Sequence, residues 1–156
     1  MSRVELSRII PASANEVWAV ISDIGAVHEF HPQIVCSPIT NGQARGVGAE
    51  RRCELIDGTE VFERVTDWHE GRSLTIAILE TAAPIVDGRA SFHIERALGA
   101  SSRVTFAMDY RPDMGIFSGL LDALVLRRRL ARLMGDVLEG LELKVTQSVA
   151  HFGLAG

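Results

Sequence analysis

The fold is decided by residues 116–149, which read IFSGLLDALVLRRRLARLMGDVLEGLELKVTQSV. Apolar residues recur here at steps of three and four, the spacing that places them on one face of an α-helix. A helix of this length spans roughly 50 Å at 1.5 Å per residue, enough to cross a whole sheet. Its apolar stripe consists of Leu120, Leu124, Ala131, Met134, Leu138, Leu141 and Val145. Such a stripe needs a partner, and the segments before it must supply one.

Alternating apolar and polar residues before the long helix predict a set of short strands. The first is expected over residues 3–10. The capping box Ser13-Ala14-Asn15-Glu16 then predicts a short helix, with Val17, Val20, Ile21 and Ile24 on its apolar face, and a further helical segment over 26–30. Six more strands are expected over residues 34–40, 48–56, 59–68, 74–78, 90–94 and 104–110.

The composition indicates one globular domain covering residues 1–156. Hydrophobic residues make up 47% and charged residues 23% of the chain. The net charge of −4 and the low aromatic content of 6% argue against a nucleic-acid partner. No signal peptide is visible, the apolar start of the long helix is too short to span a bilayer, and Cys36 and Cys53 lie in predicted strands. We therefore expect a cytoplasmic monomer or homodimer with reduced thiols and no stable membrane insertion.

This order of one strand, two short helices, six strands and a long helix resembles the START-like (SRPBCC) superfamily. Within it, the chain is most similar to the polyketide cyclase/dehydratase-like branch. The resemblance covers nearly the whole chain and is carried by Pro11-Ala12-Ser13, Glu16-Val17-Trp18, Phe30-His31-Pro32, Gly48-Ala49-Glu50-Arg51, Asp57-Gly58, Glu63-Arg64-Val65, Ser102-Arg103-Val104 and Pro112.

The resemblance implies an α+β helix-grip fold, in which a seven-stranded curved antiparallel sheet wraps around the C-terminal helix and encloses an apolar cavity. It implies no cofactor and no single reaction, because members bind lipids, hormones, polyketides or flavonoids and only some transform them. The aromatic residue common in the family's sixth strand is replaced here by Gly88, beside Asp87. This replacement is expected to enlarge or open the cavity.

Two carboxylates share the apolar face of their strands. Glu63 lies between Val61 and Val65, and Glu80 continues the face of the 74–78 strand. The alternative is that each carboxylate sits at a strand end and reaches water, and Glu80, at the end of its run, fits either position. A buried carboxylate needs a partner, and the neighbouring strand offers Arg51 or Arg52. A two-residue turn at 57–58 would place Arg52 opposite Glu63, whereas one extra turn residue shifts the pairing by one. Since Arg51 shares the face of Cys53 and Leu55, the pattern favours Arg51 as the inward residue.

One charge interrupts the stripe of the long helix. Arg127 falls between Leu124 and Ala131, so it either points into the cavity or packs its stem there and extends its head out of the open end. Both orientations place a cation at the cavity mouth, where it would meet an acidic or carbonyl ligand.

The remaining candidates lie on or beside the predicted inner face. Phe92, Met108 and Leu124 would contribute apolar lining, and the Tyr110 hydroxyl would orient a ligand oxygen. His31 is a candidate general acid or base, with a structural capping histidine as the alternative. A metal shared by His28 and His31 would need His69 or Asp67 as a third ligand, and nothing in the spacing fixes that ligand, so no metal site is expected.

Three functional hypotheses follow from these residues. The first is binding of a small, mostly hydrophobic, lipid- or polyketide-like molecule in the cavity. The second is a polyketide cyclase, aromatase or dehydratase, in which Glu63 or His31 moves the proton while Arg51, Arg127 and Tyr110 polarise a carbonyl. The third is a protein-interaction module that uses the sheet and the helix end.

Overall fold

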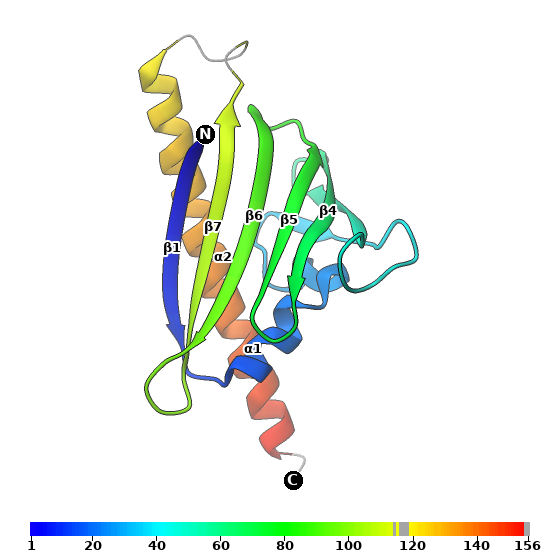
Figure 1. Ribbon diagram of the computed structural model, residues 1–156, viewed down its shortest axis with the longest axis vertical. Coiled ribbons are helices and arrows are strands. Elements are labelled where there is room, and N and C mark those ends of the chain that lie inside the picture. Colours follow the sequence, from blue (N-terminus) through cyan, green and yellow to red (C-terminus); the bar gives the residue numbers. More distant parts are fainter. Residues whose placement is uncertain (114, 116–118, 155–156) are drawn as a thin grey trace.

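The computed structural model describes the whole chain except residues 114, 116–118 and 155–156. Its strands form one antiparallel seven-stranded sheet in the order β1-β7-β6-β5-β4-β3-β2. The predicted α+β helix-grip architecture is therefore confirmed (Figure 1). In chain order the elements are β1 (Ser2–Ile10), α1 (Ala14–Ile21), the 3₁₀ helix η1 (Ile24–Glu29), β2 (Ile34–Cys36), β3 (Glu50–Leu55), β4 (Glu60–His69), β5 (Ser73–Glu80), β6 (Ile85–Arg96), β7 (Ser102–Pro112) and α2 (Leu120–Leu154).

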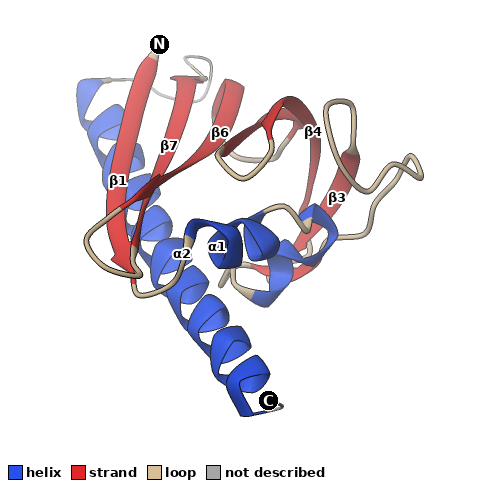
Figure 2. Ribbon diagram, turned by 60° about the horizontal axis from the view of Figure 1, so that its bottom comes forward, coloured by secondary structure: helices blue, strands red, loops and turns tan. Residues whose placement is uncertain are grey.

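The sheet curves over the long helix α2, which runs along the concave side beneath β1 and β7 (Figure 2). Met134, Leu138, Leu141 and Val145 of α2 are buried, as the stripe predicts. The helix is described from Leu120 to Leu154, so it continues past the expected end at residue 149. The predicted helical residues 116–118 lie outside the described part of the chain.

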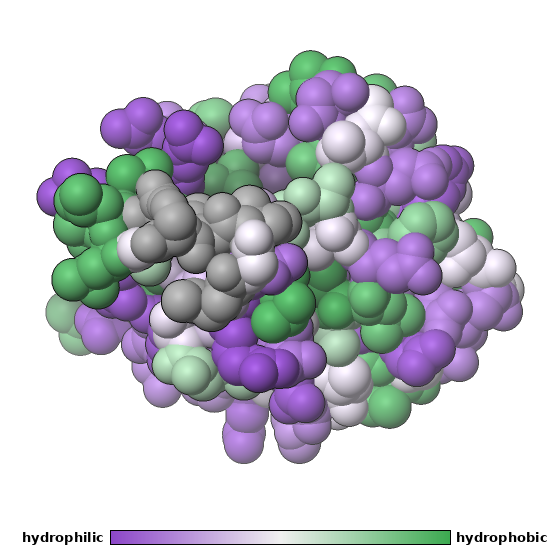
Figure 3. All heavy atoms as spheres, turned by 90° about the horizontal axis from the view of Figure 1, so that it is seen from above, coloured by the Kyte–Doolittle hydropathy of each residue, from purple (hydrophilic) through white to green (hydrophobic). Residues whose placement is uncertain are grey.

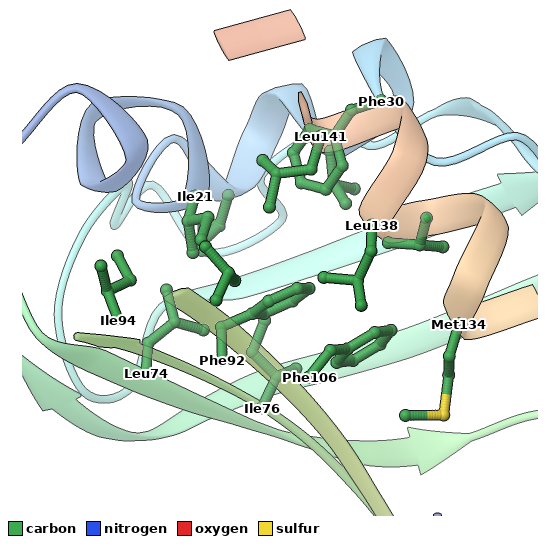
Figure 4. Packing of buried hydrophobic residues seen from close by; sticks show 14 of the residues in the cluster. Ile21, Phe30, Leu74, Ile76, Phe92, Ile94, Phe106, Met134, Leu138 and Leu141 are labelled. Atoms are coloured by element: carbon green, nitrogen blue, oxygen red, sulfur yellow. The ribbon is translucent and has the colours of Figure 1, made fainter. Parts of the chain in front are cut away.

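The core lies between the sheet and the helices and is built by side chains from distant segments. Leu74, Ile76, Phe92 and Phe106 project from the strands into the space between the sheet and the helices, where Ile21 of α1 and Leu138 of α2 also lie (Figure 4). Phe92 and Phe106, which pair in register, stack with a centroid separation of 4.3 Å and an interplanar angle of 7°. This packing fixes the distance between sheet and helix in the half of the grip nearest α1.

Helix α1 starts where the capping box predicts. The Ser13 hydroxyl accepts a hydrogen bond from the Glu16 amide at 3.2 Å, and the Glu16 carboxylate accepts one from the Ser13 amide at 2.7 Å. The helix ends at Ile21, however, and Ile24 begins η1 instead of completing the apolar face of α1. As a result, η1 covers the sheet edge formed by β2 and β3.

Strand β2 is shorter than predicted. It covers three residues, Ile34–Cys36, whereas the alternation predicted a strand over 34–40. Pro38 has no amide hydrogen to offer the ladder, and beyond it Ile39 makes only an isolated bridge with Arg51. This edge of the sheet is therefore held by η1 as well as by strand pairing.

The β3–β4 hairpin settles the register that the sequence left open. Arg51 pairs with Glu63 and Cys53 with Val61, and Leu55 donates its amide to Thr59 across a loop of residues 56–58. Gly58, the last loop residue, has a φ of 83°, as in a three-residue loop that ends in a bulge. The extra turn residue places Arg51 opposite Glu63, as the shared face with Cys53 favours.

Candidate functional site

An ion pair lies on the inner face of the sheet, beneath η1. Arg51 Nε donates to Glu63 Oε2 at 2.6 Å, and Arg51 Nη1 donates to the Ile24 carbonyl of η1 at 2.8 Å. The side chains of Arg51 and Glu63 keep only 8% and 12% of their surface accessible. The pair is thus almost removed from water.

The pair belongs to a row of inward residues that crosses the sheet. Glu63 pairs with Ile78 of β5, and Tyr110 of β7 faces the bulge in β6 that contains Asp87 and Gly88. Tyr110 is buried on the inner face, as predicted. The row therefore runs from a charged pair at β3 and β4, across an apolar centre, to a phenol at β7.

Gly88 does not open the space that its missing side chain suggests. A Cβ placed there would lie 2.9 Å from Ile78 Cδ1 and 3.2 Å from Ile85 Cδ1. Both isoleucines therefore already fill the position, and the expected enlargement of the cavity at this point is wrong. The bulge is set instead by Asp87, whose φ of 54° is tolerated by aspartate better than by most residues.

Burial and charge set the protonation of the residues around the pair. Burial alone would lower the pKa of Arg51, but the adjacent Glu63 carboxylate outweighs it and the pKa is raised. Burial, reinforced by Glu63, raises the pKa of the Cys53 thiol to about 12. Arg51 is therefore charged, and Cys53, whose Sγ lies 3.5 Å from Glu63 Oε2, is a protonated thiol and not a nucleophile.

His31 is neutral at physiological pH. Burial lowers its pKa to about 4, with Glu63 opposing and Arg51 assisting the shift. Its Nδ1 accepts a hydrogen bond from the Gln33 amide at 3.2 Å, which assigns the ring proton to Nε2. His31 also lines a hollow of about 390 Å³ between η1 and α2, together with Phe30, Ile34 and Gly140. The imidazole is therefore reachable from the surface while remaining electrostatically coupled to the ion pair.

Comparison with known proteins agrees with this arrangement. Residues 1–146 match the family described as polyketide cyclase/dehydrase and lipid transport. The chain belongs to this family. No curated protein sequence matches the chain significantly.

Solved structures with the same fold come from bacteria and from a plant. The Bacillus cereus protein XoxI superposes with a TM-score of 0.78 at 20% identity, covering 94% of this chain and 96% of its own. A START superfamily protein from Mycobacterium smegmatis superposes with a TM-score of 0.76 at 17% identity, covering 93% of this chain and 97% of its own. Ginseng major latex-like protein 151 from Panax ginseng superposes with a TM-score of 0.71 at 16% identity, covering 92% of this chain and 96% of its own. At these identities the likeness shows the fold alone.

Other predicted site residues separate into two groups. Phe92 and Met108 lie on the inner face, where Phe92 is in the core and Met108 is half-buried beside it. Glu80 is exposed at the end of β5, because a bulge after Phe62 shifts the β4–β5 pairing and the strand ends there. Of the two positions that the sequence left open for Glu80, the structure has the exposed strand end, so the inward placement is wrong and of the two carboxylates only Glu63 is inward.

Arg127 and Leu124 lie outside the grip. Arg127 is exposed, and its Nη1 donates to the Arg3 carbonyl of the edge strand β1 at 2.9 Å. Leu124 is also exposed, although the stripe assigned it to the buried face. Periodicity gives the face of a helix but not where the sheet beneath it ends, and here burial of the stripe is complete only from Met134 onward. The orientation of Arg127 into the cavity is thus wrong.

Sequence reasoning missed two participants in the site. The Ile24 carbonyl, which accepts from Arg51, belongs to η1, whereas the sequence placed Ile24 on the apolar face of the first helix and began the second helical segment at residue 26. Cys53 was expected only as a reduced thiol in a strand, although its alternation with Arg51 already placed both on one face. In the described ranges no group of three histidine, cysteine or acidic side chains gathers in a metal-binding arrangement, and His28 Nδ1 lies 2.8 Å from the Ser37 hydroxyl. The two cysteines are free.

A larger apolar groove lies outside the grip. It has a volume of about 590 Å³ and separates α1 from the C-terminal end of α2. Val20, Val145, Val149 and Phe152 supply its apolar walls, and Glu29 on its rim is paired with Lys144 at 2.9 Å. No helix in the described part of the chain has both the length and the apolar character needed to cross a membrane.

Proposed function

We propose that this protein binds a small, mostly hydrophobic, lipid- or polyketide-like molecule between the sheet and α2. The Arg51–Glu63 pair would be the polar anchor for one of its oxygens. The single observation that carries the proposal is this pair, which joins two charges at 2.6 Å on a mostly apolar inner face and keeps a small accessible surface.

The energetics of the pair favour a role beyond folding. Removing two charges from water costs several kcal/mol per ion, and their attraction roughly repays that cost. Well-packed apolar residues of similar volume would stabilise the fold as much or more. A ligand oxygen, however, needs a charged donor, and the hydrogen bonds of Arg51 to the described residues run from Nε and Nη1. Nη2 is the nitrogen that such an oxygen would meet.

The apolar surroundings suit the body of such a ligand. Val61, Ile78, Ala90 and Met108 project from the inner face and are only partly buried, unlike the core residues nearer α1. Apolar walls with a few placed polar groups are typical of sites for small hydrophobic molecules. Binding would bury the remaining apolar surface, at about 25 cal/mol for each Å² removed from water.

Native mass spectrometry of the protein purified from its own host tests the proposal. We expect one small molecule per chain on the unaltered protein and none on the Arg51→Met/Glu63→Leu variant. The matched control is the same pair of substitutions at Arg64 and Glu50, an ion pair of 2.6 Å across the same hairpin whose side chains are far more exposed. Absence of any bound molecule from the unaltered protein, or its retention by the inner-face variant, would overturn the proposal.

A second candidate function is proton transfer of the cyclase or dehydratase type in the same space. His31 favours it, because a neutral imidazole with its proton on Nε2 is a hydrogen-bond donor toward a carbonyl that becomes an enolate. Glu63 would take the proton, and Arg51 and Tyr110 would polarise the carbonyl. Incubating the recovered molecule with the unaltered protein and with His31→Gln tests this role. A mass or retention-time change that depends on His31 supports it, and an unchanged molecule in both samples refutes it.

A further inference from the structure

The first two turns of α2 expose apolar side chains that the sheet does not cover. The exposed fractions are 89% for Leu120, 77% for Leu121, 43% for Leu124 and 47% for Val125. We call these four residues the apolar tip. Apolar side chains gather on this end of the molecule, the end opposite α1 (Figure 3). A cluster of exposed leucines and valines at one end of a protein marks a surface that binds something apolar.

A group of arginines follows the apolar tip directly. Arg127, Arg128, Arg129 and Arg132 are all exposed, and we call them the arginine collar. Successive helix positions rotate by about 100°, so these side chains surround much of the helix circumference. Residues 120–132 contain one acidic residue, Asp122, so this segment is net positive in a chain whose net charge is −4.

The spacing between tip and collar matches the dimensions of a membrane surface. Arg127 follows Leu120 by seven positions, which is about 10 Å along the helix. Interfacial helices bury their apolar side chains roughly 5–10 Å into the boundary between headgroups and acyl chains. With the leucines at that depth, the guanidinium groups lie at the level of the lipid phosphates, where arginine forms bidentate hydrogen bonds.

We propose that the apolar tip and the arginine collar of α2 dock this protein reversibly onto the surface of an anionic lipid bilayer. The charge pattern favours a bilayer over a second copy of the chain. A two-fold contact through the tip would bring two arginine collars together, and their repulsion opposes it. Anionic headgroups instead provide complementary charge around the whole collar.

Co-sedimentation with lipid vesicles tests the proposal. We expect the protein to sediment with vesicles of phosphatidylcholine and phosphatidylserine, to bind phosphatidylcholine alone much more weakly, and to be released by salt. Each arginine near an anionic surface contributes about a fivefold gain in partitioning. The triple variant Arg128→Gln/Arg129→Gln/Arg132→Gln should therefore bind on the order of 100-fold more weakly. Arg127 is left intact because it also contacts β1.

The apolar contribution is tested by Leu120→Ser/Leu121→Ser, which should also weaken binding. Its matched control is Phe152→Ser/Leu154→Ser, since these two residues are 80% and 89% exposed at the opposite end of the same helix. The control should bind as the unaltered protein does. All substituted side chains are exposed, so we expect unchanged circular dichroism and thermal midpoints in the tip, collar and control variants.

A direct measurement of depth complements the variants. In Leu121→Trp, brominated phosphatidylcholine mixed with phosphatidylserine should quench the new indole. Trp18 and Trp68 contact each other near α1, at the other end of the grip, and should stay unquenched. The proposal is overturned by a lack of binding to anionic vesicles, by equal loss in the control, or by dimers that form through the tip without lipid. It does not depend on Arg51 or Glu63, so it can fail while the proposed ligand binding holds.

Discussion

Gly140 and Gly135 of α2 should respond in opposite directions to the same substitution. A Cβ at Gly140 would lie 2.2 Å from the carbonyl oxygen and 3.2 Å from the carbonyl carbon of Phe30, at the end of η1. A Cβ at Gly135 would meet only Leu6 Cδ1, at 3.9 Å, an ordinary contact. We predict that Gly135→Ala stabilises the protein and that Gly140→Ala destabilises it.

The magnitudes follow from helix propensity and from the steric contact. Alanine in place of glycine in a helix interior gains about 1 kcal/mol, and this gain applies at both positions. At Gly140 the obstacle is backbone, which cannot rotate away, so α2 and η1 must separate by about 1 Å. Overpacking of this kind costs about 1–3 kcal/mol or more. The propensity gain cancels between the two variants, and a contact of 2.2 Å with backbone places Gly140 in the upper part of that range. The free energies of unfolding should therefore differ by about 2 kcal/mol or more, with Gly140→Ala the less stable.

Urea unfolding followed by circular dichroism at 222 nm measures the difference. With a slope of about 2 kcal/mol per molar urea, the two midpoints should lie about 1 M apart on either side of the unaltered protein. Equal slopes are needed so that the shift reflects stability and not a change in the unfolded state. If Gly140→Ala unfolds at the same urea concentration as Gly135→Ala, the close approach of α2 to Phe30 does not constrain the fold and the reasoning fails.

Three further predictions concern the inner face and His31 near it. Glu63→Gln should lower the free energy of unfolding by about 3–5 kcal/mol because it leaves the buried Arg51 charge uncompensated. Arg51→Met/Glu63→Leu should leave it nearly unchanged in urea unfolding. Equal losses of stability in the two variants would contradict this account. The pKa of His31, lowered from 6.5 to about 4, means that the unfolded chain takes up the proton first, so stability falls as pH drops from 6.5 to 4. His31→Gln should remove about 2–3 kcal/mol of this loss. If the stability–pH curves of the unaltered protein and of His31→Gln run parallel, this account is refuted. Gly88→Ala should lower the free energy of unfolding by about 1–3 kcal/mol, measured by thermal unfolding. Adding Ile78→Val to this variant removes the methyl group at 2.9 Å and should recover part of the loss if steric overlap is the cause.

Local pattern was sufficient for the order of elements and for the start of α1. The capping box needs only hydrogen bonds between Ser13 and Glu16, which are three residues apart, and it forms as predicted. Alternation also placed Glu63 and Tyr110 on the inner face. These features depend on neighbours along the chain, so the sequence contains the information that specifies them.

The pairing of Arg51 with Glu63 was only half predictable. Alternation placed Arg51 on the face of Cys53, but the register depended on the number of loop residues at Asp57-Gly58. A single added residue reverses the face of a whole strand. The conformation of Gly58, with its φ of 83°, decides between the two registers, and a DG pair is compatible with both.

The sequence by itself determined the order of the elements, the inward face of most of them and the presence of a long helix that the sheet would grip. Only the tertiary structure decided how far the sheet covers that helix, and therefore that Leu124 and Arg127 lie outside the grip while Met134 and Leu138 lie within it. Periodicity arises from contacts within four residues, whereas coverage depends on segments that meet from opposite ends of the chain. The approach of Gly140 to Phe30 is such a contact, and no local pattern encodes it.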